Sequence, residues 1–283
     1  MLANLASLRT PFPGGGVRNN QHYLSTRMRE STKSSSRWTD GKWRSLIPEF
    51  GLEVAKAFRD GAVAFWRTNT PKLLSSGATP NSTPNTVVYG LTGLLIESRE
   101  TPNWAEQLTT QDAELAARYA MQELNGFPHW LPRLFAAHPQ AVSKIVMGEI
   151  DYELRTALAI SSPSHYVLSD VCSVGSWMWH RLAPELLKRL NVPMLSAAHL
   201  RDVLTILAGS EVDGADIALL ASKHATSSPD ELSSAWFAAW IGADPNQALP
   251  ALTAYLATLP DRTRQVAVAM HCLTALTGGA PRA

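Results

Sequence analysis

Apolar residues recur every three or four positions along most of the chain, which is the spacing of one face of an α-helix. The clearest run follows residue 45, and its members are Phe50, Val54, Phe58, Ala62 and Phe65. Pro48 stands just before this run and suits a first helical turn, where the N–H that proline lacks would be unpaired anyway. The pattern predicts an amphipathic helix that buries one face.

Start and stop signals predict further short helices. Thr109 and Asp112 approximate a capping box, and the pair Asn125-Gly126 suits a left-handed helix end. Three other pairs place a side-chain oxygen before a proline, as is typical of helix starts: Ser162-Pro163, Ser228-Pro229 and Asp244-Pro245.

Two glycines lie three residues apart in the apolar segment "TVVYGLTGLLIES". Gly90 and Gly93 lower the helix propensity of this segment. They also remove two side chains from one face, so we expect a neighbouring helix to approach closely there.

A tryptophan followed by a proline recurs three times. The members are Trp130 with Pro139, Trp177 and Trp179 with Pro184, and Trp236 with Pro245. Each case predicts a helix, a tight corner, and a second helix that begins near the proline. Helix pairs of about 40 to 47 residues are the units of HEAT- and armadillo-like solenoids, in which stacking covers the apolar side that one hairpin leaves open.

The expected fold is therefore all-α, an irregular stack of helical hairpins (α-solenoid, HEAT/armadillo-like) with a partly disordered N-terminal arm. We predict an arm over residues 1–44, a helical repeat-like domain over 45–277 with roughly three to five hairpins, and a tail over 278–283. The composition agrees with packed helices, because 45% of the residues are hydrophobic and Ala and Leu are abundant among them.

Charge separates the arm from the rest of the chain. Residues 1–44 contain eight basic and two acidic residues, a net charge of +6, whereas residues 45–283 have 17 basic and 22 acidic residues, a net charge of −5. We interpret the arm as a solubilising tail. The alternative is a nucleic-acid arm whose basic side chains bind phosphates: Arg18, Arg27, Arg29, Lys33, Arg37, Lys42 and Arg44.

The two cysteines and the hydropathy bear on the compartment. Cys172 and Cys272 are a hundred positions apart, so they match neither a disulfide framework nor a CxxC metal site, and we expect buried thiols in a reducing compartment. No stretch reaches the roughly 18 uninterrupted apolar residues that a membrane span requires. The expected location is cytoplasmic, without a membrane partner.

Motifs for nucleotide, metal and acyl-transfer chemistry are absent. The chain has no GxxxxGK[ST], GxGxxG, HExxH or GxSxG sequence. None of the eight histidines pairs with another at i+3 or i+4, the spacing that directs two imidazoles to one ion. We therefore predict a protein that is not an enzyme and holds no cofactor or metal.

An unrecognised hydrolase remains as a further hypothesis. Glu149 and Glu153 lie one helical turn apart and could perform acid–base work, although a solvated helix surface is the favoured interpretation. Cys172, Ser176 and His180 would share one side of a helix, but no glycine-flanked strained turn exposes a nucleophile there.

Four tryptophans are candidates for a partner surface, since this residue type is enriched at interaction hot spots. They are Trp177, Trp179, Trp236 and Trp240. Core packing is the favoured interpretation, because Trp236 and Trp240 are spaced to stack along one helical stripe.

Four stretches resemble the helical C-terminal region of large bacterial STAND-type (NACHT-like) NTPases, a group associated with anti-phage defence. They are "RWTDGKWRSLIPEFGLEVAKAFRDGAVAFWR", "GLTGLLIES", "ARYAMQELNGFPHWL" and "HPQAVSKIVMGEIDYEL", within about residues 37–160. The resemblance implies a sensor or assembly portion that works with an NTPase module and an effector. This sequence contains no P-loop, so no functional residue of the family is carried over.

Together these observations predict a non-enzymatic helical scaffold that binds a protein partner, a sensor or assembly module in the sense of that resemblance. Nucleic-acid binding through the basic arm is the alternative.

Overall fold

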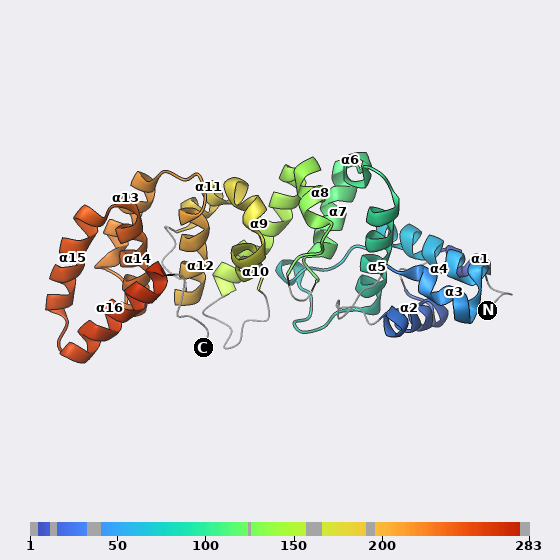
Figure 1. Ribbon diagram of the computed structural model, residues 1–283, viewed down its shortest axis with the longest axis horizontal. Coiled ribbons are helices and arrows are strands. Elements are labelled where there is room, and N and C mark those ends of the chain that lie inside the picture. The colour runs from blue at the N-terminus through green and yellow to red at the C-terminus, as the bar shows by residue number, and fades with distance from the viewer. Residues whose placement is uncertain are drawn as a thin grey trace. The chain divides into compact units, whose positions relative to one another are not determined.

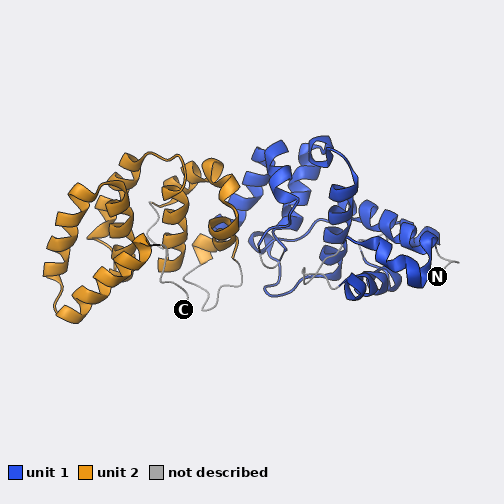
Figure 2. Cartoon of the chain, viewed as in Figure 1, with its two compact units in different colours: residues 1–152 blue, residues 153–283 orange. Residues whose placement is uncertain are grey.

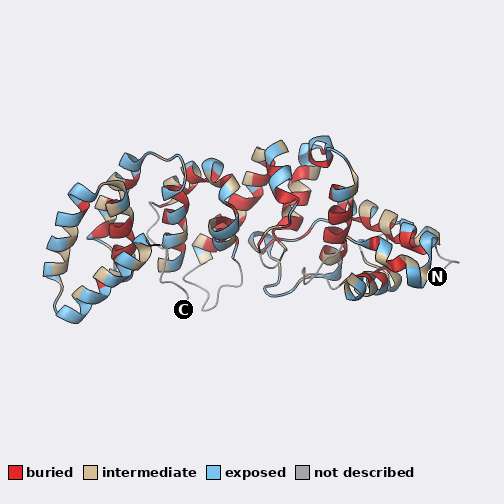
Figure 3. Ribbon diagram, viewed as in Figure 1, coloured by how far each residue is buried: buried red, intermediate tan, exposed pale blue. Residues whose placement is uncertain are grey.

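The computed structural model describes residues 5–11, 16–32, 41–123, 126–156, 166–190 and 196–277. Every regular element in these ranges is a helix, and none of them contains a strand, so the predicted all-α class is confirmed (Figure 1). The chain divides into two compact units, residues 1–152 and 153–283 (Figure 2). Buried residues lie on the sides of the helices that face their neighbours within each unit (Figure 3).

Unit 1 is built from short helices and 3-10 turns. They are α1 (Leu5–Arg9), α2 (Asn19–Thr32), η2 (Trp43–Leu46), α3 (Ile47–Phe50), α4 (Leu52–Phe65), η3 (Trp66–Thr68), η4 (Leu74–Ser76), α5 (Asn85–Glu100), α6 (Trp104–Gln107), α7 (Thr110–Ala120), α8 (Leu131–Ala137) and α9 (Pro139–Thr156). Helix α4 packs against α1, η2 and α5, and α5 packs against α7. The boundary between the units falls inside α9.

The predicted apolar face after residue 45 is confirmed. Val54, Phe58, Ala62 and Phe65 are all buried in the core of unit 1. Gly51 interrupts the predicted helix, because its φ of 81° separates α3 from α4. A positive φ is accessible to glycine at little cost, which explains why the chain turns at this position.

The glycines of α5 allow the close approach expected of them. A Cβ atom on Gly93 would lie 2.0 Å from the carbonyl oxygen of Ala62 in α4. A Cβ atom on Gly90 would lie 2.3 Å from the ring of Tyr119 in α7. The two glycines therefore let α5 contact α4 and α7 at distances that no larger residue permits.

The predicted arm, residues 1–44, contains helices in its described part, and these pack into the core of unit 1. Helices α1 and α2 bury Leu8, Leu24 and Met28 completely in the core of unit 1. Trp43 is also buried there. Leu24 and Met28 are one helical turn apart on α2, so apolar residues at helical spacing give this part of the chain a buried face. Residues 1–4, 12–15 and 33–40 lie outside the described ranges.

In the described residues, unit 2 consists of the end of α9 and eight further elements. They are α10 (Val167–Val174), η5 (Ser176–Met178), α11 (Trp179–Arg189), α12 (Ala197–Ala208), α13 (Gly214–Ala225), α14 (Asp230–Ala243), α15 (Pro245–Thr258) and α16 (Arg262–Leu276). Helix α14 is the centre of this unit, since it packs against α12, α13, α15 and α16. The predicted tail, 278–283, lies outside the described residues.

The helix break predicted beside a proline is confirmed at two of the three positions, Pro139 and Pro245. Helix α8 ends before His138, and α9 begins at Pro139. The Nε2 atom of His138 lies 2.9 Å from the carbonyl oxygen of Ala105, so this ring contacts a backbone carbonyl of α6. Helix α14 likewise ends before Asp244, and α15 begins at Pro245.

The third predicted corner is wrong, because Pro184 lies inside α11. A proline in a helix leaves the carbonyl four residues earlier without its hydrogen bond. Here that carbonyl belongs to His180, and both residues are exposed. On the exposed side of a helix, water can replace a missing backbone partner, which lowers the cost of a proline at such a position.

The predicted caps have mixed outcomes. The side chain of Thr109 accepts from the backbone N–H of Asp112, and that of Asp244 accepts from Gln247, so both are N-caps as expected. Ser228 is not a cap, because Pro229 occupies the N-cap position of α14. Ser162, Pro163 and Asn125 lie outside the described residues.

Within the described ranges, no helix combines the length and the apolar character that crossing a bilayer would require.

Candidate functional site

Two of the four candidate tryptophans belong to the core. Trp236 is 4% exposed and stacks on His224 with ring centroids 5.1 Å apart. Trp240 is 9% exposed and stacks on Phe237. These two residues do not form part of an exposed partner surface, which corrects that alternative and agrees with core packing.

The other two tryptophans are half-buried on η5 and α11. The indole N–H of Trp177 donates to the carbonyl of Val174 at 3.2 Å, and that of Trp179 donates to Val171 at 2.7 Å. The ring of Trp179 also fills the space beside Gly209, at the end of α12. Both side chains thus have local structural partners, and their role in partner binding stays a prediction.

The basic residues proposed for nucleic-acid binding are partly engaged by carboxylates. Arg27 pairs with Glu49 and Glu30, both at 2.9 Å, and Arg44 pairs with Glu100 at 3.1 Å. Arg18, Arg29 and Lys42 also have interaction partners within the protein. Lys33 and Arg37 lie outside the described residues.

The two glutamates of α9 are buried, which contradicts the expected solvated surface. Glu149 is fully buried, and Glu153 is 4% exposed. One oxygen of Glu153 accepts the backbone N–H of Leu168 at 3.1 Å, in the first turn of α10. The other lies 3.2 Å from Nε2 of His199 on α12. The burial of Glu153 is explained by these partners, because a carboxylate at a helix N-terminus and beside an imidazole is stabilised.

His199 links this carboxylate to the start of its own helix. Its Nδ1 atom lies 2.9 Å from Oγ of Ser196, which is also the N-cap of α12. The two ring nitrogens of His199 thus contact the carboxylate of Glu153 on one side and the hydroxyl of Ser196 on the other. Ser196, His199 and Glu153 are the residue types of a serine-histidine-carboxylate triad. The hydroxyl of Ser196, however, caps α12 by accepting the backbone N–H of His199.

Asp202 and Cys172 lie next to this group. Burial raises the pKa of Asp202 above its ordinary value, and the charge of Glu153 adds to the effect while His199 opposes it. Burial and the charge of Asp202 raise the pKa of Cys172 to about 11. A thiol of this kind is protonated at neutral pH and is a poor nucleophile.

Cys172, Ser176 and His180 do not share one helix as the hydrolase hypothesis required, because they lie on α10, η5 and α11 in turn. Cys172 is partnered by Asp202 and Thr205 on α12, whereas His180 is exposed on α11. Among the described residues, no three His, Cys, Asp or Glu side chains gather closely enough to hold a metal ion. The contacts of Glu153 and Cys172 join helices, and neither residue lines the cavity described next.

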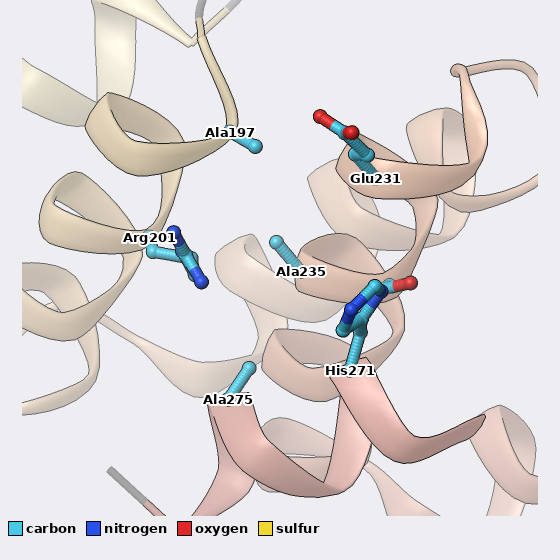
Figure 4. A pocket seen from close by; sticks show the side chains of 7 residues that line it. Ala197, Arg201, Glu231, Ala235, His271 and Ala275 are labelled. Atoms are coloured by element: carbon cyan, nitrogen blue, oxygen red, sulfur yellow. The ribbon is translucent and has the colours of Figure 1, made fainter. Parts of the chain in front are cut away.

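A cavity of about 250 Å³ lies in unit 2 between α12, α14 and α16. Small residues form much of its wall: Ala197, Ser234, Ala235 and Ala275. Arg201, Glu231 and His271 also line the cavity and are exposed at its edge (Figure 4). Ser234 is buried and donates to the carbonyl of Asp230, so its hydroxyl is already used.

One face of α16 is apolar and exposed. Val266, Met270 and Leu273 follow the spacing i, i+4, i+7 and are 52, 55 and 54% exposed. Val268 and Cys272, on the other side of the helix, are buried against the rest of unit 2. We call Val266, Met270 and Leu273 the α16 stripe.

Sequence reasoning missed both surfaces. The spacing of Val266, Met270 and Leu273 is visible in the sequence, but an apolar stripe on a helix usually predicts core, as it does around Phe58. Arg201 and Glu231 are 30 residues apart and carry no local signal. Only the packing of three helices places their side chains around one cavity.

Comparisons of the chain with protein-family models, curated proteins and solved structures find no match in any of the three.

Proposed function

We propose that the chain is a non-enzymatic helical scaffold that binds a protein partner, and that the partner docks on the α16 stripe. The observation that carries the proposal is the exposure of Val266, Met270 and Leu273 along one helical face. No element among the described residues covers these side chains. Grouped exposed apolar side chains of this kind favour association with another protein.

The chemistry of the surface indicates the occupant, an amphipathic helix with acidic flanks. Side chains at i, i+4 and i+7 match the anchors of a second helix that lies alongside. Helix α16 contains no acidic residue, and α15 contains no charged residue at all. Arg262 is exposed at the start of α16 and makes no ion pair with a described residue, so it is free to meet a carboxylate.

The competing functions have less support. Nucleic-acid binding would use Arg27 and Arg44, which already pair with carboxylates. Hydrolysis would use Glu153 or Cys172, whose contacts join helices. The role as a sensor or assembly module of a STAND-type defence NTPase is compatible with partner binding and rests on the sequence resemblance alone.

The proposal is tested with a fluorescent helical peptide that carries leucines at i, i+4 and i+7 and glutamates beside them. Anisotropy should show saturable binding to the full chain. Met270→Glu and Leu273→Glu should each weaken binding about tenfold or more, because burying such a side chain contributes about 1.5–3 kcal/mol. Leu219→Glu is the matched control, since Leu219 is 73% exposed on α13 and lies outside the stripe.

Equal binding by all four proteins would overturn the proposal. Sedimentation velocity of the chain alone provides a second test, because association between copies that Met270→Glu abolishes would make the stripe a self-association surface instead. Affinity capture from nuclease-treated lysate then identifies natural partners, and only those lost with Met270→Glu and kept with Leu219→Glu count in favour.

A further inference from the structure

The cavity between α12, α14 and α16 brings together opposite charges that do not pair with each other. Arg201 comes from α12 and Glu231 from the first turn of α14. Neither side chain makes a hydrogen bond or an ion pair with a described residue, although the charge of Arg201 also acts on the neighbouring Asp202. Two exposed side chains of opposite charge on the wall of one cavity can both contact a ligand that carries both charges.

From this geometry we infer that the cavity binds a small zwitterion of amino-acid size. The guanidinium of Arg201 has the planar donor arrangement that holds a carboxylate. The carboxylate of Glu231 can accept hydrogen bonds from an ammonium group. His271, the third polar residue at the edge, offers one further donor or acceptor from α16.

Charge balance excludes simpler ligands as the best fit. Arg201 and Glu231 bring one positive and one negative charge to the lining of the cavity, and these two charges cancel. A simple anion would meet Arg201 but also Glu231, and a simple cation would meet Glu231 but also Arg201. Since like charges placed together cost binding energy, a net-neutral ligand with separated charges is the complementary one.

The volume and the apolar lining of the cavity limit the length of the ligand between its two charges and the size of its side chain. Its volume of about 250 Å³ is below the roughly 300–1,000 Å³ of pockets for drug-sized ligands. The methyl groups of Ala197, Ala235 and Ala275 are the apolar part of the lining, and of the three only Ala235 is buried (Figure 4). The part of the ligand between its charges is therefore short, and its side chain is small and apolar.

The test uses L-alanine and its two half-molecules, propionate and ethylamine, as probes. Methyl NMR of the full chain labelled at alanine reports directly on Ala197, Ala235 and Ala275. We expect L-alanine to shift these three signals saturably and to bind more tightly than propionate or ethylamine. Arg201→Gln and Glu231→Gln should each weaken L-alanine binding roughly tenfold, the size expected for a lost hydrogen bond to a charged group.

Matched controls are Arg181→Gln and Glu211→Gln, which remove exposed charges of the same types outside the cavity. They should leave the affinity unchanged. The inference is overturned if L-alanine shifts none of the three methyl signals at tens of millimolar, or if propionate binds as tightly as L-alanine. It is also overturned if Arg201→Gln and Glu231→Gln bind as the wild type does. The α16 stripe is not part of this test, so the proposed function stands or fails separately.

Discussion

The indole N–H of Trp66 donates to Oε2 of Glu97 at 2.6 Å, and the guanidinium of the next residue, Arg67, pairs with both oxygens of the same carboxylate. The guanidinium also lies over the Trp66 ring, 4.1 Å from its centroid. Trp43 and Arg44 make a similar arrangement three residues further along α5, where both donate to Oε1 of Glu100 and Arg59 donates to Oε2. Two Trp-Arg dipeptides thus bind glutamates of the same helix, α5.

Replacing Glu97 with alanine should destabilise unit 1. Trp66 is fully buried, so its N–H would lose its acceptor without gaining water. An unsatisfied buried donor costs about 1–3 kcal/mol, and we expect a loss of about 2 kcal/mol in the free energy of unfolding. Urea denaturation followed by tryptophan fluorescence measures this change.

Glu106→Ala on α6 is the matched control, because that glutamate is exposed and makes no ion pair with a described residue. It should change the free energy of unfolding by less than about 0.5 kcal/mol. If the two variants are equally stable, the contact between Trp66 and Glu97 contributes nothing to the fold.

Short-range patterns in the sequence were sufficient to predict many of the helices and several of their caps. The buried face of α4 and the cap at Asp244 both depend on residues within one or two turns of each other. Pro184 was predicted to lie at a corner but lies inside α11. Whether a helix tolerates a proline depends on the surroundings of that position in the folded protein, and a local sequence pattern does not show them.

The candidate sites could not be predicted in the same way. Glu153 occupies a polar stretch that is typical of a helix surface, and its burial depends on Leu168 and His199, which lie 15 and 46 residues further along the chain. The cavity likewise needs Arg201 and Glu231 from separate helices. Such contacts arise from packing, and a single sequence carries no signal for them.

Gly93→Ala should separate α4 from α5. The added methyl group would lie 2.0 Å from the carbonyl oxygen of Ala62, and a backbone atom cannot move aside without shifting its helix. We expect unit 1 to lose about 1–3 kcal/mol of stability, as is common for overpacked cores. Differential scanning calorimetry should show the loss as a lower Tm.

The same substitution at Gly148 in α9 provides the comparison. A Cβ atom there would meet no heavy atom within 4 Å. Alanine is a better helix former than glycine by about 1 kcal/mol, so Gly148→Ala should leave the Tm unchanged or raise it. A Tm that rises equally in both variants would show that α4 and α5 are not in close contact.

Cys172 should react slowly with iodoacetamide. Its pKa is raised from 9.0 to about 11, so at pH 8 the folded protein holds about 100-fold less thiolate than a free thiol does. Alkylation followed by mass spectrometry should therefore be about 100-fold slower for the folded chain than for the chain in guanidinium chloride. Fast alkylation of folded Cys172 at pH 8 would restore it as a candidate nucleophile.

Asp202 should make the stability of unit 2 depend on pH. Burial raises its pKa above the ordinary value of 3.8. An acid of this kind binds more protons in the folded state, so the stability that it contributes is complete below its ordinary pKa. That stability is lost as the pH rises through the folded value. Asp202→Asn imitates the protonated side chain and should therefore stabilise unit 2 at pH 7.

The gain should shrink as the pH falls and disappear below about pH 3.8, where the wild-type carboxyl is protonated in both states. Urea denaturation at a series of pH values measures the difference between the two proteins. Glu211→Gln, at an exposed carboxylate in the loop after α12, should show no such dependence. A variant Asp202→Asn that is less stable than the wild type at pH 7 would mean that the ionised side chain interacts favourably with His199 or Arg201. That interaction would then exceed the cost of its burial.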